Sequence, residues 1–239
     1  MFPASGPLQL AGWYHLALFG LLVPYSVLRN RRKLPVSRQS VPLDRMRHMR
    51  TTALMLVLFT ALSLFIARVQ WIELFPRVFP PLDALAAGAA SYVAAVLFMR
   101  PRWRRAVQER RRIVHLFMPS NATERAWWIL VAVLAGVGEE ITWRGVQAAL
   151  LITLTGSFWL AALLSAASFG VAHVMQGWKS AGVIVVFALG FHALVWLSGS
   201  LYVAMVVHLA YDITAGLTYG RLGRQLGYSL EPAPSAAPR

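Results

Sequence analysis

The chain has 239 residues, of which 58% are hydrophobic and only 13% are charged, and its mean hydropathy is +0.57. This composition is typical of a polytopic membrane protein and excludes an ordinary soluble globular domain. The absence of cysteine excludes disulfides, thiolate zinc sites, thiol nucleophiles and prenyl or palmitoyl anchors on this chain. The formal net charge of +14 comes from basic residues that flank apolar segments. We interpret it as a topology signal that faces anionic lipid, and we expect no nucleic-acid partner.

Apolar segments of membrane-spanning length follow one another along the chain. They predict an all-α fold, a polytopic membrane helical bundle of about seven transmembrane helices. The expected spans are 9–28, 52–70, 82–99, 126–152, 157–176, 181–198 and 200–219.

Most of the 23 Lys and Arg residues fall in loops on one side of these spans. The opposite side holds only Arg68 and Arg77, and Arg144 is embedded in the fourth span. The positive-inside rule therefore predicts an N-terminus outside and a C-terminus in the cytoplasm. We expect anionic lipid to contact the basic cytoplasmic loops, and we expect an integral, multi-pass protein of the bacterial inner (plasma) membrane.

The chain divides into three predicted regions. Residues 1–120 form an N-terminal three-span region with basic cytoplasmic loops, 121–220 a four-span core, and 221–239 a disordered cytoplasmic tail. Residues 101–118 mix arginines with apolar side chains, which is compatible with an amphipathic surface helix or with a solvated loop. Residues 120–124 supply N-cap residues for the fourth span. We expect interfacial belts from the aromatic residues Trp127, Trp128, Trp159, Trp178 and Tyr202.

Glu139, Glu140 and Arg144 are the only formally charged residues between Trp127 and Ile152. Placing such groups in hydrocarbon costs roughly 2.5 kcal/mol or more each, so the cluster indicates a functional site. On an α-helix, Glu140 and Arg144 lie on one face within salt-bridge reach, and Glu139 lies about 100° round the turn. The pair can be a purely structural ion pair or the support of a working Glu139.

Histidines lie in the later spans. His208 and Asp212 are one helical turn apart on one face of the seventh span, so Asp212 can hold one ring nitrogen of His208. A lone membrane histidine, such as His192 or His15, is more often a bundle residue with satisfied hydrogen bonds. Two adjacent carboxylates together with His173 and a carboxylate-backed His208 are instead the groups needed to activate a water and stabilise an oxyanion.

The order of these motifs resembles the CAAX-protease and bacteriocin-processing (CPBP, or Abi) family of intramembrane endopeptidases. The motifs are Glu-Glu-x-x-x-Arg-Gly, then Phe-x-x-x-His, then His-x-x-x-Asp. The resemblance covers roughly residues 125–215, and the first three spans contain none of these motifs. The residues that carry it are Glu139, Glu140, Arg144, Gly145, Phe169, His173, His208 and Asp212.

The resemblance implies an endopeptidase that cleaves a membrane-anchored protein or peptide, in C-terminal processing or in the removal of a sorting tail. It implies that Glu139 is the general base and that His173 positions the attacking water. His208 and Asp212 would polarise the scissile carbonyl and stabilise the oxyanion. The implied supporting residues are Glu140, Arg144 and Phe169.

Two features of the site leave alternatives open. The family's last motif often carries Asn, whereas an ionised Asp212 cannot donate a hydrogen bond and must be protonated or serve to orient His208. Glu139, His173 and His208 can also be read as a His₂Glu zinc site with one open position. We expect no cofactor, with zinc as the alternative.

The depth of the site is a further constraint. Glu139 lies roughly 13 residues after the predicted start of its span, whereas His173 lies near the cytoplasmic end of the fifth span. A tilt or a longer fourth helix must bring the two residues level.

Other functions use similar residues. A non-catalytic membrane-binding or immunity-type protein can use the same scaffold to sequester a peptide. A proton-coupled transporter also buries Glu, Arg, His and Asp, but it usually shows repeated halves with broken helices, which this sequence lacks.

Overall fold

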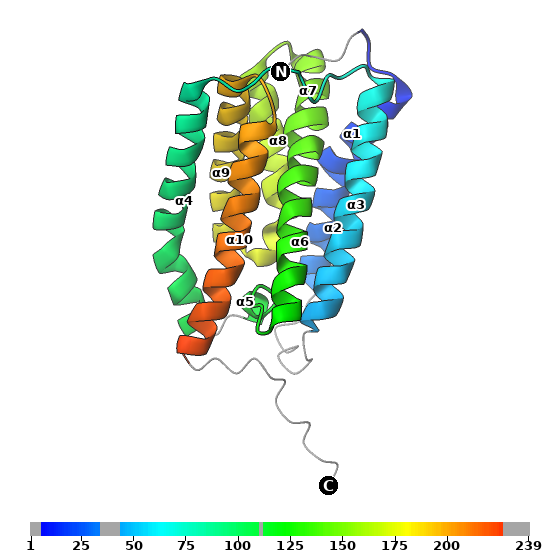
Figure 1. Ribbon diagram of the computed structural model, residues 1–239. Coiled ribbons are helices and arrows are strands. Elements are labelled where there is room, and N and C mark those ends of the chain that lie inside the picture. Colours follow the sequence, from blue (N-terminus) through cyan, green and yellow to red (C-terminus); the bar gives the residue numbers. More distant parts are fainter. Residues whose placement is uncertain (1–5, 34–43, 110–111, 227–239) are drawn as a thin grey trace.

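The computed structural model describes residues 6–33, 44–109 and 112–226, and within these residues the fold is all-helical. Seven helical rods run up and down side by side, so that α1 begins at one end of the bundle and α10 ends at the other (Figure 1). The elements are α1 (Leu10–Ala17), η1 (Leu18–Leu22), α2 (Val23–Lys33), α3 (Arg45–Val69), α4 (Leu82–Gln108), α5 (Arg112–His115), α6 (Ala122–Glu139), η3 (Glu140–Gln147), α7 (Ala148–Thr155), α8 (Phe158–Ala172), η4 (Val174–Gln176), α9 (Trp178–Ser198) and α10 (Tyr202–Gln225).

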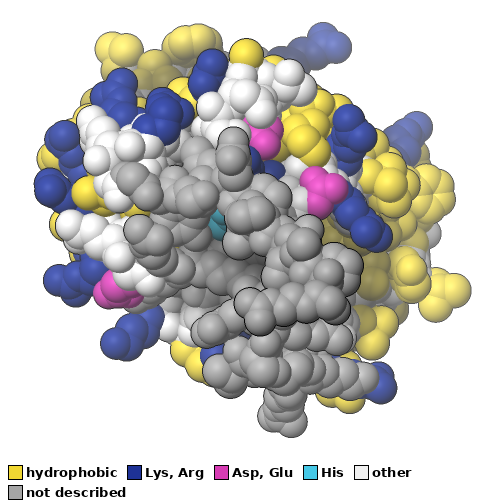
Figure 2. Space-filling view, turned by 90° about the horizontal axis from the view of Figure 1, so that it is seen from below, with side chains coloured by type: hydrophobic (Ala, Val, Ile, Leu, Met, Phe, Trp, Pro, Cys, Tyr) yellow, Lys and Arg dark blue, Asp and Glu magenta, His cyan; other side chains and the backbone are white. Residues whose placement is uncertain are grey.

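The predicted all-α membrane bundle is confirmed. Among the described residues, five rods are long and apolar enough to cross a membrane: Leu10–Arg31, Arg45–Val69, Leu82–Gln108, Ala122–Thr155 and Trp178–Ser198. The other two are α8, which is apolar but shorter, and α10. Basic side chains surround the end of the bundle seen from below (Figure 2). Which end faces the cytoplasm remains a prediction.

Several predicted spans end too early, because the helix continues through charged residues beyond its apolar segment. The rod α4 runs to Gln108, past Pro101. Neither interpretation of residues 101–118 is therefore right: Val107 and Val114 are buried in a cluster that packs against Leu222 of α10. The predicted disorder from residue 221 is also wrong for 221–225, which are the last turn of α10; residues 227–239 lie outside the described part of the chain.

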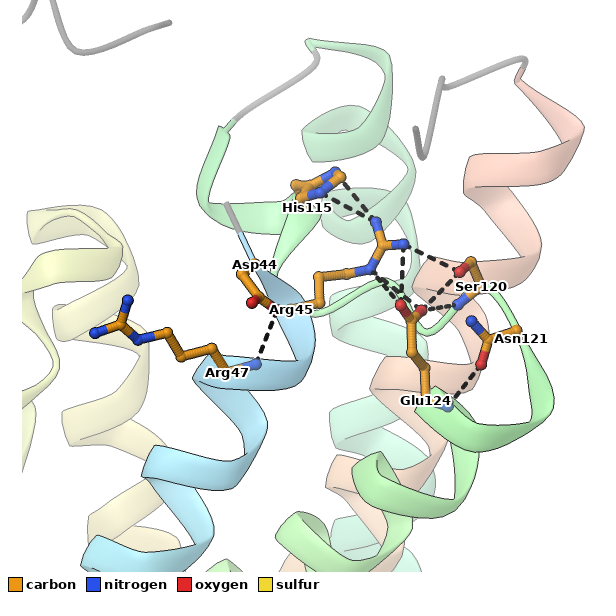
Figure 3. Close-up of polar contacts among 7 residues, drawn as sticks. All are labelled: Asp44, Arg45, Arg47, His115, Ser120, Asn121 and Glu124. Carbon is orange, nitrogen blue, oxygen red and sulfur yellow. Dashed lines mark hydrogen bonds and ion pairs between the residues drawn. The ribbon is translucent and has the colours of Figure 1, made fainter. Parts of the chain in front are cut away.

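The first turns of α3 and α6 are capped by side chains, and the cap of α6 lies within the predicted residues 120–124 (Figure 3). The Asn121 side chain accepts a hydrogen bond of 2.8 Å from the backbone N–H of Glu124, and Asp44 accepts one of 2.9 Å from that of Arg47. These bonds satisfy N–H groups that a helix leaves unpaired in its first turn. The Glu124 carboxylate also forms an ion pair of 3.2 Å with Arg45, which ties the start of α6 to the start of α3.

Helices α6 and α10 approach each other closely at Gly136. A Cβ added at Gly136 would lie 2.6 Å from the backbone nitrogen of Leu209. This contact, at a residue three positions before Asp212, holds the last turn of α6 directly against α10. The Trp128 indole packs on Gly216 and donates a hydrogen bond of 2.9 Å to the backbone oxygen of Asp212. Trp128 is therefore a buried packing residue, and its predicted place in an interfacial belt is wrong.

The tight packing at Gly136 gives a testable expectation. Replacing Gly136 with Ala should lower the free energy of unfolding by about 1–3 kcal/mol, because the added methyl group meets backbone atoms that cannot turn aside. Circular dichroism of the detergent-solubilised protein on heating would measure the change. Gly190→Ala in α9 is the matched control, since no heavy atom lies within 4 Å of its added Cβ. Equal melting midpoints for the two variants would contradict the close contact.

Candidate active site

The site begins where the backbone of the fourth rod changes from an α-helix to a π-helix. The change occurs at Glu140, and every residue of η3 is buried. Such wide turns inside helices occur frequently at functional sites. Here the turn directs Glu140 and Arg144 into the bundle, where Arg144 Nη1 lies 3.2 Å from Glu140 Oε1 and both side chains have no exposed surface. The predicted ion pair is thus present and fully buried.

His208 of α10 meets three carboxylates. Its Nδ1 lies 2.7 Å from Glu140 Oε1, while its Nε2 lies 3.5 Å from Asp212 Oδ2 and 3.8 Å from Glu139 Oε2. An ionised carboxylate only accepts hydrogen bonds, so Nδ1 carries a hydrogen and donates it to Glu140. The sequence predicted Asp212 as the partner of His208, but the shortest contact is the one to Glu140.

Aromatic rings enclose the buried charges. The Arg144 guanidinium lies 4.5 Å from the ring centroid of Phe169 and 5.3 Å from that of Phe191. The Phe191 ring also stacks on the His208 ring, with centroids 5.0 Å apart and an angle of 16° between the planes. A cation over an aromatic face is attracted by the ring quadrupole, most strongly where water is excluded. Phe191 was not among the predicted site residues.

His173 joins the site from α8. It follows the last residue of that helix, its Nδ1 lies 2.8 Å from the backbone oxygen of Phe169, and it interacts electrostatically with Glu139. The 15 residues of α8 extend about 22 Å from Phe158 toward His173. In the fourth rod, the 16 residues from Thr155 back to Glu139 extend about 24 Å. The short α8 and the long fourth rod therefore place the two side chains at similar depth.

The described structure brings almost all of the predicted site residues together. Glu139, Glu140, Arg144, His208 and Asp212 form one connected polar cluster. In this cluster Glu139 and Asp212 keep 19% and 29% of their side-chain surface exposed, whereas Glu140 keeps none, so the first two can reach water or a substrate.

His192 is not part of this polar cluster. It is fully buried, and neither ring nitrogen has a hydrogen-bond partner among the described residues. The expectation that its hydrogen bonds are satisfied is therefore wrong.

Zinc binding stays a prediction, although its expected ligands all lie among the described residues. Within them, no group of three or more His, Asp or Glu side chains has an arrangement that can hold a metal ion. We therefore assign no step of the reaction to a metal.

A second buried polar network holds η3 from the other side. His15 of α1 lies 3.1 Å from Gln147 Oε1 and 3.2 Å from Ser63 Oγ, and Ser63 donates a hydrogen bond of 3.0 Å to Thr142 Oγ1. His15 is thus satisfied, as predicted. The network itself was not predicted, although polar residues inside apolar spans are a signal for it. Since Thr142 and Gln147 flank Arg144, the first and second rods fix the segment that presents Glu140.

Comparison with known proteins finds one similarity, which covers this site. Residues 121–214 match the model of the family described as type II CAAX prenyl endopeptidase Rce1-like. The match runs from the N-cap of α6 into α10 and includes Glu139, Glu140, His173, His208 and Asp212, which confirms the resemblance drawn from the motifs. The rods α1 to α4 lie outside it. The comparisons with curated proteins and with solved structures found no match.

The His15 network can be tested by its effect on stability. His15→Leu should lower the free energy of unfolding by about 1–3 kcal/mol, because it leaves the buried side-chain oxygen of Gln147 without its partner, whereas Ser63 keeps its bond to Thr142. Tyr14→Leu is the control on the same helix, because Tyr14 is 54% exposed and should tolerate the change. Thermal unfolding in detergent compares the two variants. A His15→Leu protein as stable as the control would show that the network does not stabilise η3.

Proposed function

Because residues 121–214 match the model of the type II CAAX prenyl endopeptidase Rce1-like family, we propose that the protein is an intramembrane endopeptidase. It hydrolyses a peptide bond near the C-terminus of a membrane-anchored protein or peptide. One observation supports this function above the others: Glu139, His208 and Asp212 meet inside an apolar bundle, in contact with the fully buried Glu140–Arg144 pair.

In the proposed reaction, Glu139 is the general base. Its carboxylate takes a proton from a water molecule while the water oxygen attacks the scissile carbonyl carbon, and the same proton later passes to the departing amine. Glu139 suits this role because it is partly exposed, whereas Glu140 is fully buried and forms the close ion pair with Arg144. His173, at the same depth, helps to hold the attacking water.

His208 is the proposed oxyanion donor, in the imidazolium form that carries a hydrogen on both ring nitrogens. Glu140 binds Nδ1 and fixes the ring, which leaves Nε2 directed at the space beside Glu139. The 3.8 Å between Nε2 and Glu139 Oε2 is longer than a hydrogen bond, so a third oxygen can approach both groups. A positioned N–H donor stabilises the negative charge that develops on the carbonyl oxygen of the tetrahedral intermediate.

Glu140 and Arg144 support the reaction without contacting the substrate. Arg144 balances the charge of Glu140, and its contacts with Phe169 and Phe191 keep water away from the pair. Glu140 can then remain an acceptor for His208 throughout the reaction, and Asp212 supplies a second carboxylate beside Nε2.

Glu139→Gln tests the central role in this mechanism. The substitution keeps the shape of the side chain but removes the base, so cleavage should fall by roughly 10²–10⁴-fold while insertion and expression stay normal. Glu73→Gln is the control, because Glu73 is an exposed carboxylate outside the cluster. The readout is mass spectrometry of membrane-protein C-termini in host cells that carry either variant or the wild type.

Near-normal processing by Glu139→Gln would remove the mechanism. A biological activity that survives in this variant without any processing would favour the non-catalytic binder, and uptake of a solute by vesicles would favour the transporter. Cleavage should also persist in the presence of a chelator. Stoichiometric zinc in the purified protein, together with loss of activity on chelation, would overturn the metal-independent mechanism.

A second expectation concerns the last motif. Asp212→Asn should keep cleavage within roughly tenfold of the wild type, because the amide retains an oxygen beside His208 and can also donate to an oxyanion. Asp212→Ala should lose roughly 10²-fold or more, since it leaves Nε2 without this neighbour. Initial rates of cleavage of one processed substrate would separate the two. Equal rates for both variants would show that Asp212 has no part in the reaction.

A further inference from the structure

A cleft of about 650 Å³ lies between the last turns of α4 and α10. Three arginines line it: Arg100 and Arg104 from α4, and Arg221 from α10. Thr218 and Gln225 of α10 add polar groups, and the cleft has no acidic residue in its lining. Its chemistry is therefore that of an anion site.

The helices themselves position these groups. Arg100 and Arg104 are four residues apart on one face of α4, and Thr218, Arg221 and Gln225 follow one another at spacings of three and four on one face of α10. Between the helices, the buried Trp103 packs its ring against those of Tyr211 and Tyr219 of α10. The arginines are thus presented by two packed helices and not by a loop.

The positive charge of the cleft is uncompensated within the described residues, where no carboxylate pairs with Arg100, Arg104 or Arg221. Their neighbour Arg102 is directed elsewhere: it donates a hydrogen bond of 2.8 Å to the backbone oxygen of Phe98 and lies over the ring of that residue. A concavity lined by charges of one sign concentrates counter-ions, so an anion bound there relieves the mutual repulsion of the arginines.

The depth of the cleft indicates which anion binds. Arg100 lies 18 residues after Leu82, about 27 Å along α4, and Arg221 lies 19 residues after Tyr202, about 28 Å along α10. These lengths approach the ~30 Å thickness of the hydrocarbon core, which places the arginines at the level of lipid phosphates. Beside them, Val93, Leu97 and Phe98 are exposed apolar residues that acyl chains can cover.

We propose that this cleft binds the headgroup phosphate of one anionic phospholipid. Guanidinium groups bind phosphate oxygens in a bidentate manner, and basic pockets between transmembrane helices are suited to anionic headgroups. The site is more specific than the general contact between basic loops and anionic lipid expected from the sequence. It also stands independently of the proposed proteolysis. The bound lipid clamps α4 to α10, the helix that presents His208 and Asp212.

Native mass spectrometry of the full chain in detergent tests the proposal, with phosphatidylglycerol, phosphatidylcholine or inorganic phosphate added. We expect one tightly bound phosphatidylglycerol per chain. The triple variant Arg100→Gln, Arg104→Gln and Arg221→Gln should bind it about 100-fold more weakly, because each arginine near a lipid phosphate contributes about a factor of five in affinity. The triple variant Arg102→Gln, Arg105→Gln and Arg224→Gln is the matched control, since it loses the same charge outside the cleft.

Three results would overturn the proposal. An equal loss of affinity in both triple variants would mean that lipid binding depends on diffuse charge alone. Equal binding of phosphatidylcholine would exclude selection for an anionic lipid. Displacement of the lipid by inorganic phosphate at similar concentration would identify a site for free anions. Thermal unfolding in phosphatidylcholine micelles shows that each variant is folded, so a loss of binding can be assigned to the cleft.

Discussion

The carboxylate of Glu140, shared between Arg144 and His208 without contact with solvent, is the interaction on which the rest of the site depends. Removing one partner of a buried ion pair leaves an uncompensated charge and is strongly destabilising, by about 3–5 kcal/mol. Glu140, Arg144 and His208 must therefore remain together in the folded chain. Since η3 provides the first two and α10 the third, this requirement sets how the fourth rod and the last rod face each other.

Contacts elsewhere in the bundle also hold η3 and α10 in this arrangement. Gly136 allows α6 to approach the backbone of α10 at Leu209, and Trp128 bonds to the backbone of Asp212. On the opposite side of η3, the network around His15 comes from rods that lie outside the family match. The first two rods are therefore structural partners of the proposed catalytic segment, although they contain none of its motifs.

The rod α10 connects two different environments. Its middle presents His208 and Asp212 inside the bundle, and Arg221 lies nine residues beyond Asp212, about 14 Å along the helix. Its last turn lies at the lower end of the bundle in Figure 1, the end at which Figure 2 shows many basic side chains. A lipid phosphate in the arginine cleft would contact the same rigid element that orients His208, so the surrounding membrane can influence the geometry of the site through one helix.

The sequence by itself determined the helical fold, the approximate positions of the rods, the caps at Asn121 and the pairing of Glu140 with Arg144. All of these depend on local information, because apolar length, capping side chains and i,i+4 spacing act within a few residues. The motifs also predicted the similarity to CAAX endopeptidases that residues 121–214 show, and nearly all members of the polar cluster.

Only the tertiary structure decided how these residues are connected. The contact between Glu140 and His208 joins residues 68 positions apart, and that between His15 and Gln147 joins residues 132 apart. The stacking of Phe191 on His208 likewise depends on how separate helices pack. The depth of His173 in the bundle depends on where α8 ends. Periodicity shows which face of a helix is polar, but the partner of that face is set by close packing between distant segments, which no local pattern in the chain encodes.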